Sequence, residues 1–331
     1  MGKQALVAIS GRVCLIGIKA NLSMAFKALA DVFQLYNNAL FPNTGAFMSA
    51  HVQGILWALL ASFCFASMGV VLKLTHQQFD FHSVELVFWR MFPACLFLGA
   101  LAFRGKKRFA TKYASRHLGR SLSGVVSMML YFYAVSQLPL SVAVSISYSS
   151  SIFLALWSLG LKGERLGLGQ QSALILGLLG VVILLQPEYS GQSLWGMMAA
   201  VLSAVLAGLA YFQLRELGQL GEPAWRTVFY MSLVGTIVSA VLTSFWGWHD
   251  VSQEAWFYVL GISTLALIGQ MALTEAYAIG RKETISVLSY ITVVVASFWS
   301  YWYFGEILVG VQYGGIWLIV ISGMISALAK K

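Results

Sequence analysis

The chain has 331 residues, of which 59% are hydrophobic and only 10% are charged, and its formal net charge is +9. Soluble domains carry about 25% charged residues, so this composition excludes an ordinary soluble domain. In a soluble protein the basic excess would suggest nucleic acid as a partner, but we expect none here, because the charges lie mainly in connections between apolar stretches. The composition indicates a protein that crosses a membrane many times.

Residues 1–47 contain no uninterrupted apolar run long enough to cross a membrane. A secretory signal peptide fits them poorly, because the apolar core is short and no small-residue cleavage site follows it. Met48 stands just before the first apolar stretch and is a candidate start of the chain; otherwise residues 25–36 are expected to lie on the inner surface as an amphipathic helix. We expect this N-terminal extension to be dispensable or assigned to the chain in error.

Ten apolar stretches follow, each close to the roughly 20 residues that cross a bilayer as a helix. They cover residues 54–74, 83–103, 118–135, 142–159, 171–185, 194–212, 227–245, 255–279, 285–304 and 311–328. Because lipid offers no hydrogen-bond partners, each backbone must bond to itself, and these stretches are predicted to be helices. The predicted fold class is therefore an all-α polytopic membrane protein with ten transmembrane helices.

The block 147–170 recurs later in the chain as 289–312, and eight of its positions match without a gap. The matched pairs are Ser147 and Ser289, Tyr148 and Tyr290, Trp157 and Trp299, Ser158 and Ser300, Gly163 and Gly305, Glu164 and Glu306, Leu166 and Leu308, and Gln170 and Gln312. A period this long is typical of a duplicated half of one domain. It predicts a first repeat over 48–188, with helices 1–5, and a second over 189–331, with helices 6–10.

Each predicted repeat has an odd number of spans, so the second repeat is expected to be inverted relative to the first. That arrangement is typical of secondary transporters, whose substrate site lies between the inverted halves. If both termini are cytoplasmic, only Lys73 of the 21 Lys and Arg lies near an outer end, and Arg90 lies inside a span. The positive-inside rule therefore places both termini in the cytoplasm, with the connections 137–141 and 250–254 outside.

Signatures of enzymes and of bound metals are missing from the sequence. It contains no His-Glu-x-x-His, no Gly-x-Ser-x-Gly, no phosphate loop and no acidic cluster placed for a metal. Cys14, Cys64 and Cys95 show neither metal-binding nor redox spacing. We therefore predict that the chain is not an enzyme and has no catalytic residues, metal or cofactor.

Polar side chains recur on one face of several predicted spans, at helical spacing. The stripes consist of Ser123, Ser127 and Tyr131; Ser145, Tyr148 and Ser149; Ser263, Gln270, Thr274 and Tyr277; and Ser286, Ser289, Tyr290 and Ser297. Such side chains are costly against lipid and are expected to point inward, although each hydroxyl can instead bond to a carbonyl one turn back. We predict a shared substrate cavity lined by Tyr131, Ser145, Tyr148, Gln270, Tyr277, Ser289 and Tyr290.

Few charged residues lie at membrane depth, and most have a structural interpretation. Arg90 is expected to pair with Glu85 or with the ends of neighbouring helices. Glu164 and Glu306 each follow the glycine that ends an apolar helix, where a carboxylate can cap the next helix. Glu275 either reaches the inner interface and pairs there, or acts as a proton-coupling group in a partly dry cavity.

In order along the chain, these features resemble the EamA-type transporters of the drug/metabolite transporter superfamily. The matching segments are Phe88-Trp89-Arg90, the basic connection leading to His117 and Arg120, Tyr133-Ala134 with Leu138-Pro139-Leu140, Ala276-Tyr277, Ser289-Tyr290 and the two Gly-Glu pairs. The resemblance runs from residue 54 to 328 and is greatest to small-metabolite carriers that include riboflavin and S-adenosylmethionine uptake proteins. It implies a bacterial inner-membrane protein. The proline that usually follows the Tyr of span 4 is absent after Tyr148 and after Tyr290, so helix bending like the family's is not assured.

The predicted cavity is rich in hydroxyls and aromatic rings and has almost no cations, which argues against phosphates and nucleotide sugars. We therefore predict a secondary transporter that moves a small neutral, zwitterionic or cationic metabolite, such as an amino acid, amine, nucleoside or vitamin, by alternating access. A passive channel or facilitator is the alternative, and an intramembrane enzyme would need a nucleophile–base pair at depth. The expected partners are the substrate and the lipid bilayer, and small residues four apart leave a homodimer open.

Overall fold

A computed structural model describes residues 50–79, 81–105, 108–163, 167–184, 193–279, 285, 288–306 and 310–328. The chain divides into two compact units, 1–48 and 49–331, and the first lies outside the described residues, as does the prediction made for the extension. The helices are α2 Ala50–Phe79, α3 Ser83–Arg104, α4 Ala114–Gln137, α5 Leu140–Tyr148, α6 Ser150–Lys162, α7 Leu168–Leu184, α8 Leu194–Gln219, α9 Ala224–Trp246, α10 Gln253–Ile279, α12 Ile291–Phe304 and α13 Gly310–Leu328.

The described chain is helical throughout its regular elements, and the described part of each predicted apolar stretch lies in one or two helical segments. Within the described ranges, seven helical segments are long and apolar enough to cross a membrane: Val52–Phe79, Ser83–Arg104, Ala114–Gln137, Leu140–Lys162, Leu194–Gln219, Ala224–Trp246 and Gln253–Ala276. Shorter apolar helices cover Ile291–Phe304 and Gly310–Ser322. The protein is therefore an all-α integral membrane protein, while the predicted number of ten spans stays a prediction.

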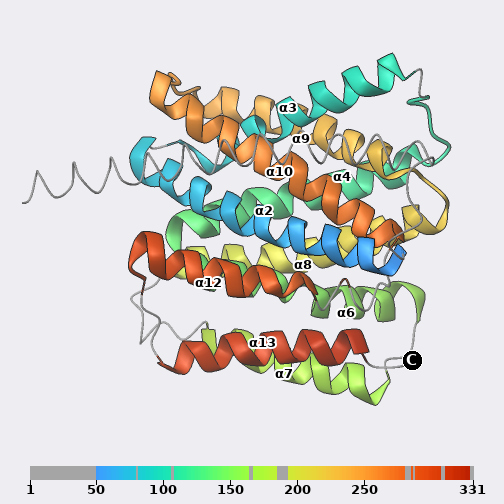
Figure 1. The fold of residues 1–331 in the computed structure, drawn as a ribbon, viewed down its shortest axis with the longest axis vertical. Coiled ribbons are helices and arrows are strands. Elements are labelled where there is room, and N and C mark those ends of the chain that lie inside the picture. The colour runs from blue at the N-terminus through green and yellow to red at the C-terminus, as the bar shows by residue number, and fades with distance from the viewer. Residues whose placement is uncertain are drawn as a thin grey trace, which may run out of the picture. The chain divides into compact units, whose positions relative to one another are not determined.

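Helices from the two predicted repeats pack against each other in an exchanged pattern. The most extensive contacts pair α2 with α10, α4 with α8, α3 with α9 and α7 with α13. The helices can be counted within each half, with α5 and α6 together as the fourth helix of the first half. The first helix of each half then packs on the third helix of the other half. The two second helices pack together, and so do the two fifth helices. Figure 1 shows α7 and α13 along one edge of the bundle and α3 and α9 along the opposite edge. Such exchange is what an approximate two-fold relation between the halves produces.

One long segment in each half is interrupted in its middle without a proline. Between α5 and α6, the Ser149 N–H donates to the Ile146 carbonyl at 3.0 Å, and the Ser149 hydroxyl donates to the same carbonyl at 2.6 Å. The Ser151 hydroxyl donates to the Tyr148 carbonyl at 3.3 Å. At the start of α12, Val293 N–H donates to the Tyr290 carbonyl, also three residues back. Hydroxyls and three-residue turns therefore interrupt the α-helical ladder.

Small residues let particular helices approach closely inside the bundle. A Cβ built on Gly208 would lie 2.7 Å from the Phe153 Cβ and 2.8 Å from the Leu154 backbone nitrogen, so α8 and α6 meet there. A Cβ on Gly310 or Gly314 would meet no described atom within 4 Å. Gly208 of α8 thus packs within the chain, whereas Gly310 and Gly314 of α13 have open space beside them in its described part, and the possible homodimer stays a prediction.

Candidate functional site

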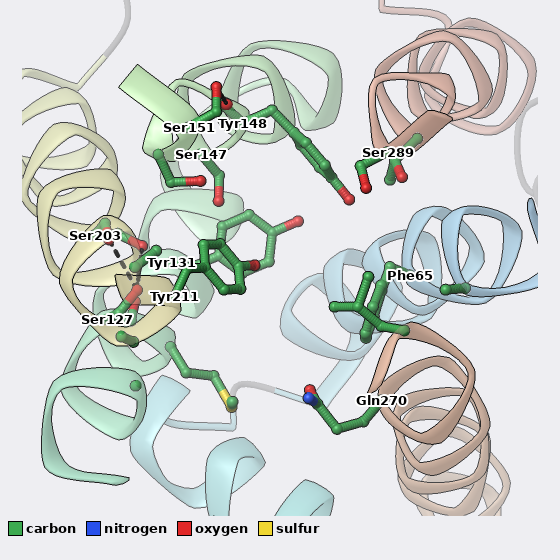
Figure 2. A pocket seen from close by; sticks show the side chains of 18 of the residues that line it. Phe65, Ser127, Tyr131, Ser147, Tyr148, Ser151, Ser203, Tyr211, Gln270 and Ser289 are labelled. Carbon is green, nitrogen blue, oxygen red and sulfur yellow. Dashed lines mark hydrogen bonds between the residues drawn. The ribbon is translucent and has the colours of Figure 1, made fainter. Parts of the chain in front are cut away.

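A cavity of about 180 Å³ lies near the middle of the helices and draws its walls from both halves of the chain. Its lining residues come from α2, α3, α4, α5 and α6 on one side and from α8, α9, α10 and the start of α12 on the other. Figure 2 shows Tyr131 and Tyr211 projecting into the cavity and Gln270 entering it from α10. Non-helical backbone at membrane depth is tolerated where it lines such a cavity, and both helix interruptions lie at its wall.

Five of the seven side chains predicted to share a cavity line this one, namely Tyr131, Tyr148, Gln270, Ser289 and Tyr290. The rings of Tyr148 and Tyr290, which are matched positions of the repeat, have centroids 6.2 Å apart. Figure 2 shows the Tyr148 hydroxyl turned toward Ser289. The two interruptions thus face each other across the boundary between the halves, and their part in binding stays a prediction.

The other two predicted lining residues do not contribute to the described cavity. Ser145 is fully buried, and its hydroxyl donates to the Ser141 carbonyl at 2.7 Å, one turn back in α5. Its predicted place in the cavity is therefore wrong, because the side chain is enclosed between packed helices and is not part of the cavity lining. The side chain of Tyr277 lies outside the described residues.

Ser127 and Ser203 join α4 to α8 at the cavity wall. Each hydroxyl donates to the other residue's carbonyl at 2.8 Å, and the two hydroxyl oxygens are 3.2 Å apart, as the dashed line in Figure 2 indicates. This reciprocal pair fixes the third helix of one half against the first helix of the other. The polar stripe of α4 therefore serves packing as well as lining.

Two arginines, Arg90 and Arg120, also line the cavity, where the sequence pattern predicted mainly hydroxyls and aromatic rings. The predicted Arg90–Glu85 pair is wrong, because five helical residues place these side chains about 140° apart. Glu85 instead accepts hydrogen bonds from His249, with Nδ1 at 2.7 Å. The Arg90 guanidinium lies over the rings of Phe65 and Phe132, with centroids at 6.0 and 5.7 Å.

Arg120 is 4% exposed and reaches the cavity from the second turn of α4. Its Nε and Nη1 atoms have no hydrogen-bond partner among the described residues. The premise that the cavity has almost no cations is therefore wrong. Helical spacing could have predicted that Arg120 lines the cavity, because it lies seven residues before Ser127 and therefore on the same face of α4 as Ser127 and Tyr131.

The two halves are also joined by a buried ion pair at the end of the bundle where α4 meets α5; we call it the Lys73 cluster. Lys73 is 9% exposed in its side chain, pairs with Glu306 and donates to the Leu138 carbonyl at 2.8 Å. Glu306 also accepts from the Leu140 N–H at 3.0 Å and from the Ser300 hydroxyl. Glu306 thus binds the first turn of α5, which belongs to the other half. The sequence instead predicted that Glu306 caps the next helix of its own half.

At the opposite end, Glu222 holds together the connection before α4 and the turn between α8 and α9; we call this the Glu222 cluster. Its carboxylate accepts from Thr111 at 2.7 Å, lies 3.2 Å from the His117 Nε2 and accepts from Arg226 at 2.9 Å. Burial opposes ionisation, but these hydrogen bonds and the Arg226 charge outweigh it and lower the pKa of Glu222 below its ordinary value.

The structure describes few contacts for the remaining charged residues that the sequence singled out. Glu275 is partly buried near the end of α10 and is not part of the cavity lining. Lys282, its predicted neighbour, and Glu164 lie outside the described residues. Proton coupling by Glu275 and capping by Glu164 therefore stay predictions. No group of three or more His, Cys, Asp or Glu that could hold a metal occurs in the described part of the chain.

Comparison with known proteins follows the same division of the chain. The model of the EamA-like transporter family matches residues 52–186 and again residues 194–328. A solved crystal structure that is 17% identical aligns with a TM-score of 0.56, over 83% of this chain and 96% of that one, and shows likeness of fold alone.

Curated relatives are transporters from several organisms. The pseudopaline exporter of Pseudomonas aeruginosa is 28% identical over 84% of this chain and 97% of its own length. The riboflavin transporter of Rhizobium johnstonii is 29% identical over 70% of this chain and 76% of its own length. The S-adenosylmethionine uptake transporter of Rickettsia prowazekii is 22% identical over 78% of this chain and 87% of its own length.

Proposed function

We propose that this chain, which belongs to the EamA-like transporter family, is a secondary carrier that moves a small metabolite by alternating access. Transport and not enzyme chemistry is the activity of this family. The observation that carries the proposal is the central cavity, whose walls come from both halves of the chain. In an alternating-access carrier, two halves rock around such a fixed site.

The Lys73 cluster supports a mechanism in which one end of the cavity opens by separating the halves. Lys73 and Leu140 belong to the first half, whereas Glu306 and Ser300 belong to the second. No residue of the cluster lines the cavity, and Val70, Leu72 and Leu138 around it are buried. The packed cluster would close this end, and rocking would require its hydrogen bonds to break together.

The inverted relation of the repeats gives the mechanism its symmetry. We propose that both termini are cytoplasmic, as the basic connections indicate, so that the Lys73 cluster faces outside. In a chain without its native cysteines, Gln137→Cys should react with an impermeant thiol reagent added to intact cells, and Lys112→Cys should react only after lysis. Both positions are exposed and lie at opposite ends of α4. The reverse result would reverse the topology.

Transport itself is tested with the full chain reconstituted in liposomes. A carrier shows counterflow: excess unlabelled substrate loaded inside the liposomes drives labelled substrate added outside to accumulate inside. A passive channel lets labelled substrate equilibrate without accumulation. We expect counterflow, and equilibration alone would replace the carrier by the facilitator. Candidate substrates come from the named relatives, which include riboflavin and S-adenosylmethionine transporters.

Among the predicted substrate classes, a cation fits the cavity least. Arg90 and Arg120 line it, and its described lining contains no Asp or Glu. A like charge would be repelled at close range in a site of low dielectric. Neutral and zwitterionic metabolites of the size of an amino acid, nucleoside or vitamin therefore remain. Acidic substrates are no longer disfavoured, because the case against them rested on a cavity with almost no cations.

A further inference from the structure

We propose that Arg90 and Arg120 form an anion-binding subsite, so that the substrate of the proposed carrier bears a carboxylate or a phosphate. The inference deepens the proposed function. It rests on that function only in stating that the bound anion is also the transported substrate. What carries it is a pair of buried guanidinium groups that face a common cavity and have no counter-charge among the described residues. We call these two residues the arginine pair.

The surroundings of the arginine pair contain no described group that neutralises it. Arg90 and Arg120 are 7% and 4% exposed, and neither forms an ion pair with any described residue. Burying a charge is expensive unless it is paired. Lys73 and His117, which are also buried, each face a carboxylate. The missing partner of the arginine pair therefore points to a bound anion.

Arg120 is placed to receive such an anion rather than to support the helix. Its Nε and Nη1 atoms lack described partners although its side chain is buried. A Cβ built on Gly124 would lie 2.3 Å from Nη1, so the guanidinium occupies the space that the missing side chain leaves on α4. Five N–H donors in a planar fork suit a carboxylate or phosphate, which accepts two of them side by side.

The two guanidinium groups approach the cavity from different depths. α3 ends at Arg104 and the antiparallel α4 begins at Ala114, so Arg90 lies about four turns before that end of α3 and Arg120 lies about two turns into α4. Tyr211 lines the same cavity as both guanidinium groups. Arg120 and Arg90 can thus each bind an anionic group along the cavity. A molecule with an acidic group at both ends would contact both arginines.

The first test needs no ligand. Arg120→Met removes an unpaired buried charge and keeps the apolar stem, so the purified full chain should melt at the same temperature or a few degrees higher. Arg116→Met is the matched control: it lies one turn away on α4, is 49% exposed in its side chain and faces Glu216. A marked fall in the melting temperature for Arg120→Met alone would make Arg120 a structural residue and overturn the proposal.

The second test measures thermal shifts with acids and their neutral counterparts: nicotinate and nicotinamide, glutarate and glutaramide, phenyl phosphate and phenol, and inorganic phosphate alone. Acids should raise the melting temperature and their counterparts should not, and the carboxylate and phosphate arms tell which group is preferred. Arg120→Gln should weaken acid binding roughly tenfold or more, and Arg116→Gln should not. Equal shifts for acid and counterpart, or no shift from any acid, would overturn the proposal.

Gly124→Ala provides a variant that keeps the charge. Alanine favours the helix, but its methyl group would displace the Arg120 guanidinium. Acid binding should therefore fall while the protein stays folded. Failure of this inference is distinguishable from failure of the carrier mechanism: acids that bind without counterflow would remove only the mechanism, and counterflow of neutral compounds without acid preference would remove only the anion subsite.

Discussion

Two kinds of buried cation occur in this bundle, and their surroundings differ. Lys73 lies where the two halves meet at one end, against the Glu306 carboxylate and the Leu138 carbonyl. Arg90 and Arg120 lie at the central cavity and have no described carboxylate near them. A satisfied charge holds two pieces of protein together, whereas an unsatisfied one is available to a ligand. The difference separates the residues that close the proposed carrier from those that would bind its substrate.

The largest expected effect comes from breaking the Lys73 cluster. Glu306→Ala leaves Lys73 buried without its counter-charge and should lower the free energy of unfolding by about 3 kcal/mol. Replacing both residues by apolar ones, Lys73→Met with Glu306→Leu, should recover most of that loss. Lys162→Ala, which removes the exposed pair with Glu216, should cost less than about 1 kcal/mol. Equal costs for Glu306→Ala and Lys162→Ala, measured by denaturant unfolding in detergent, would contradict the comparison.

A smaller effect is expected from giving the cavity the carboxylate it lacks. Gln270→Glu changes the side chain little in size, and Gln270 lines two cavities together with Arg90. The ligand-free protein should be stabilised by about 1 kcal/mol, and glutarate binding should weaken, because the new carboxylate competes for the guanidinium groups. Gln137→Glu, exposed at the end of α4, should change neither. An unaltered glutarate affinity in Gln270→Glu would separate Gln270 from the subsite.

The Glu222 cluster gives a test at the opposite end of the bundle, through pH. The folded pKa of Glu222 is lowered, so its contribution to stability is present above the ordinary carboxyl pKa of 4.5 and is lost as pH falls below it. Between pH 7 and pH 3, the wild type should therefore lose more stability than Glu222→Gln, by on the order of 1 kcal/mol. Glu216→Gln, at an exposed pair, should behave like the wild type. Identical losses in wild type and Glu222→Gln would show that the cluster is not held by ionised Glu222.

The last prediction concerns removal of the N-terminal extension, which should have no effect. A chain that begins at Met48 retains the helices, the Lys73 cluster and the cavity, because all described elements begin at or after Ala50. It should therefore insert, bind acids and show counterflow like the full chain. Counterflow lost from a stable shortened protein would assign a function to residues 1–47.

The sequence by itself determined the class of protein and its internal duplication. Apolar stretches of membrane-spanning length leave no choice but helices, since lipid cannot satisfy a free backbone group. The returning Ser-Tyr and Gly-Glu pairs marked the two halves, and five of the side chains picked from helical stripes, among them Tyr148, Tyr290 and Gln270, lie at one cavity. Periodicity along one helix is local information, so the sequence carries it directly.

Only the tertiary structure decided which charges face one another. Glu306 meets a lysine 233 residues away, and Arg120 belongs to the cavity although it follows a basic connection. Ser145 carries the same stripe pattern as its neighbours but is enclosed between packed helices and does not reach the cavity. The sequence shows which face of a helix a side chain lies on, but the helix opposite that face depends on how the two halves pack together. The role of a buried charge depends on the groups that it faces. The packing of the halves therefore decides whether such a charge forms an ion pair that closes the bundle or is available to bind a ligand.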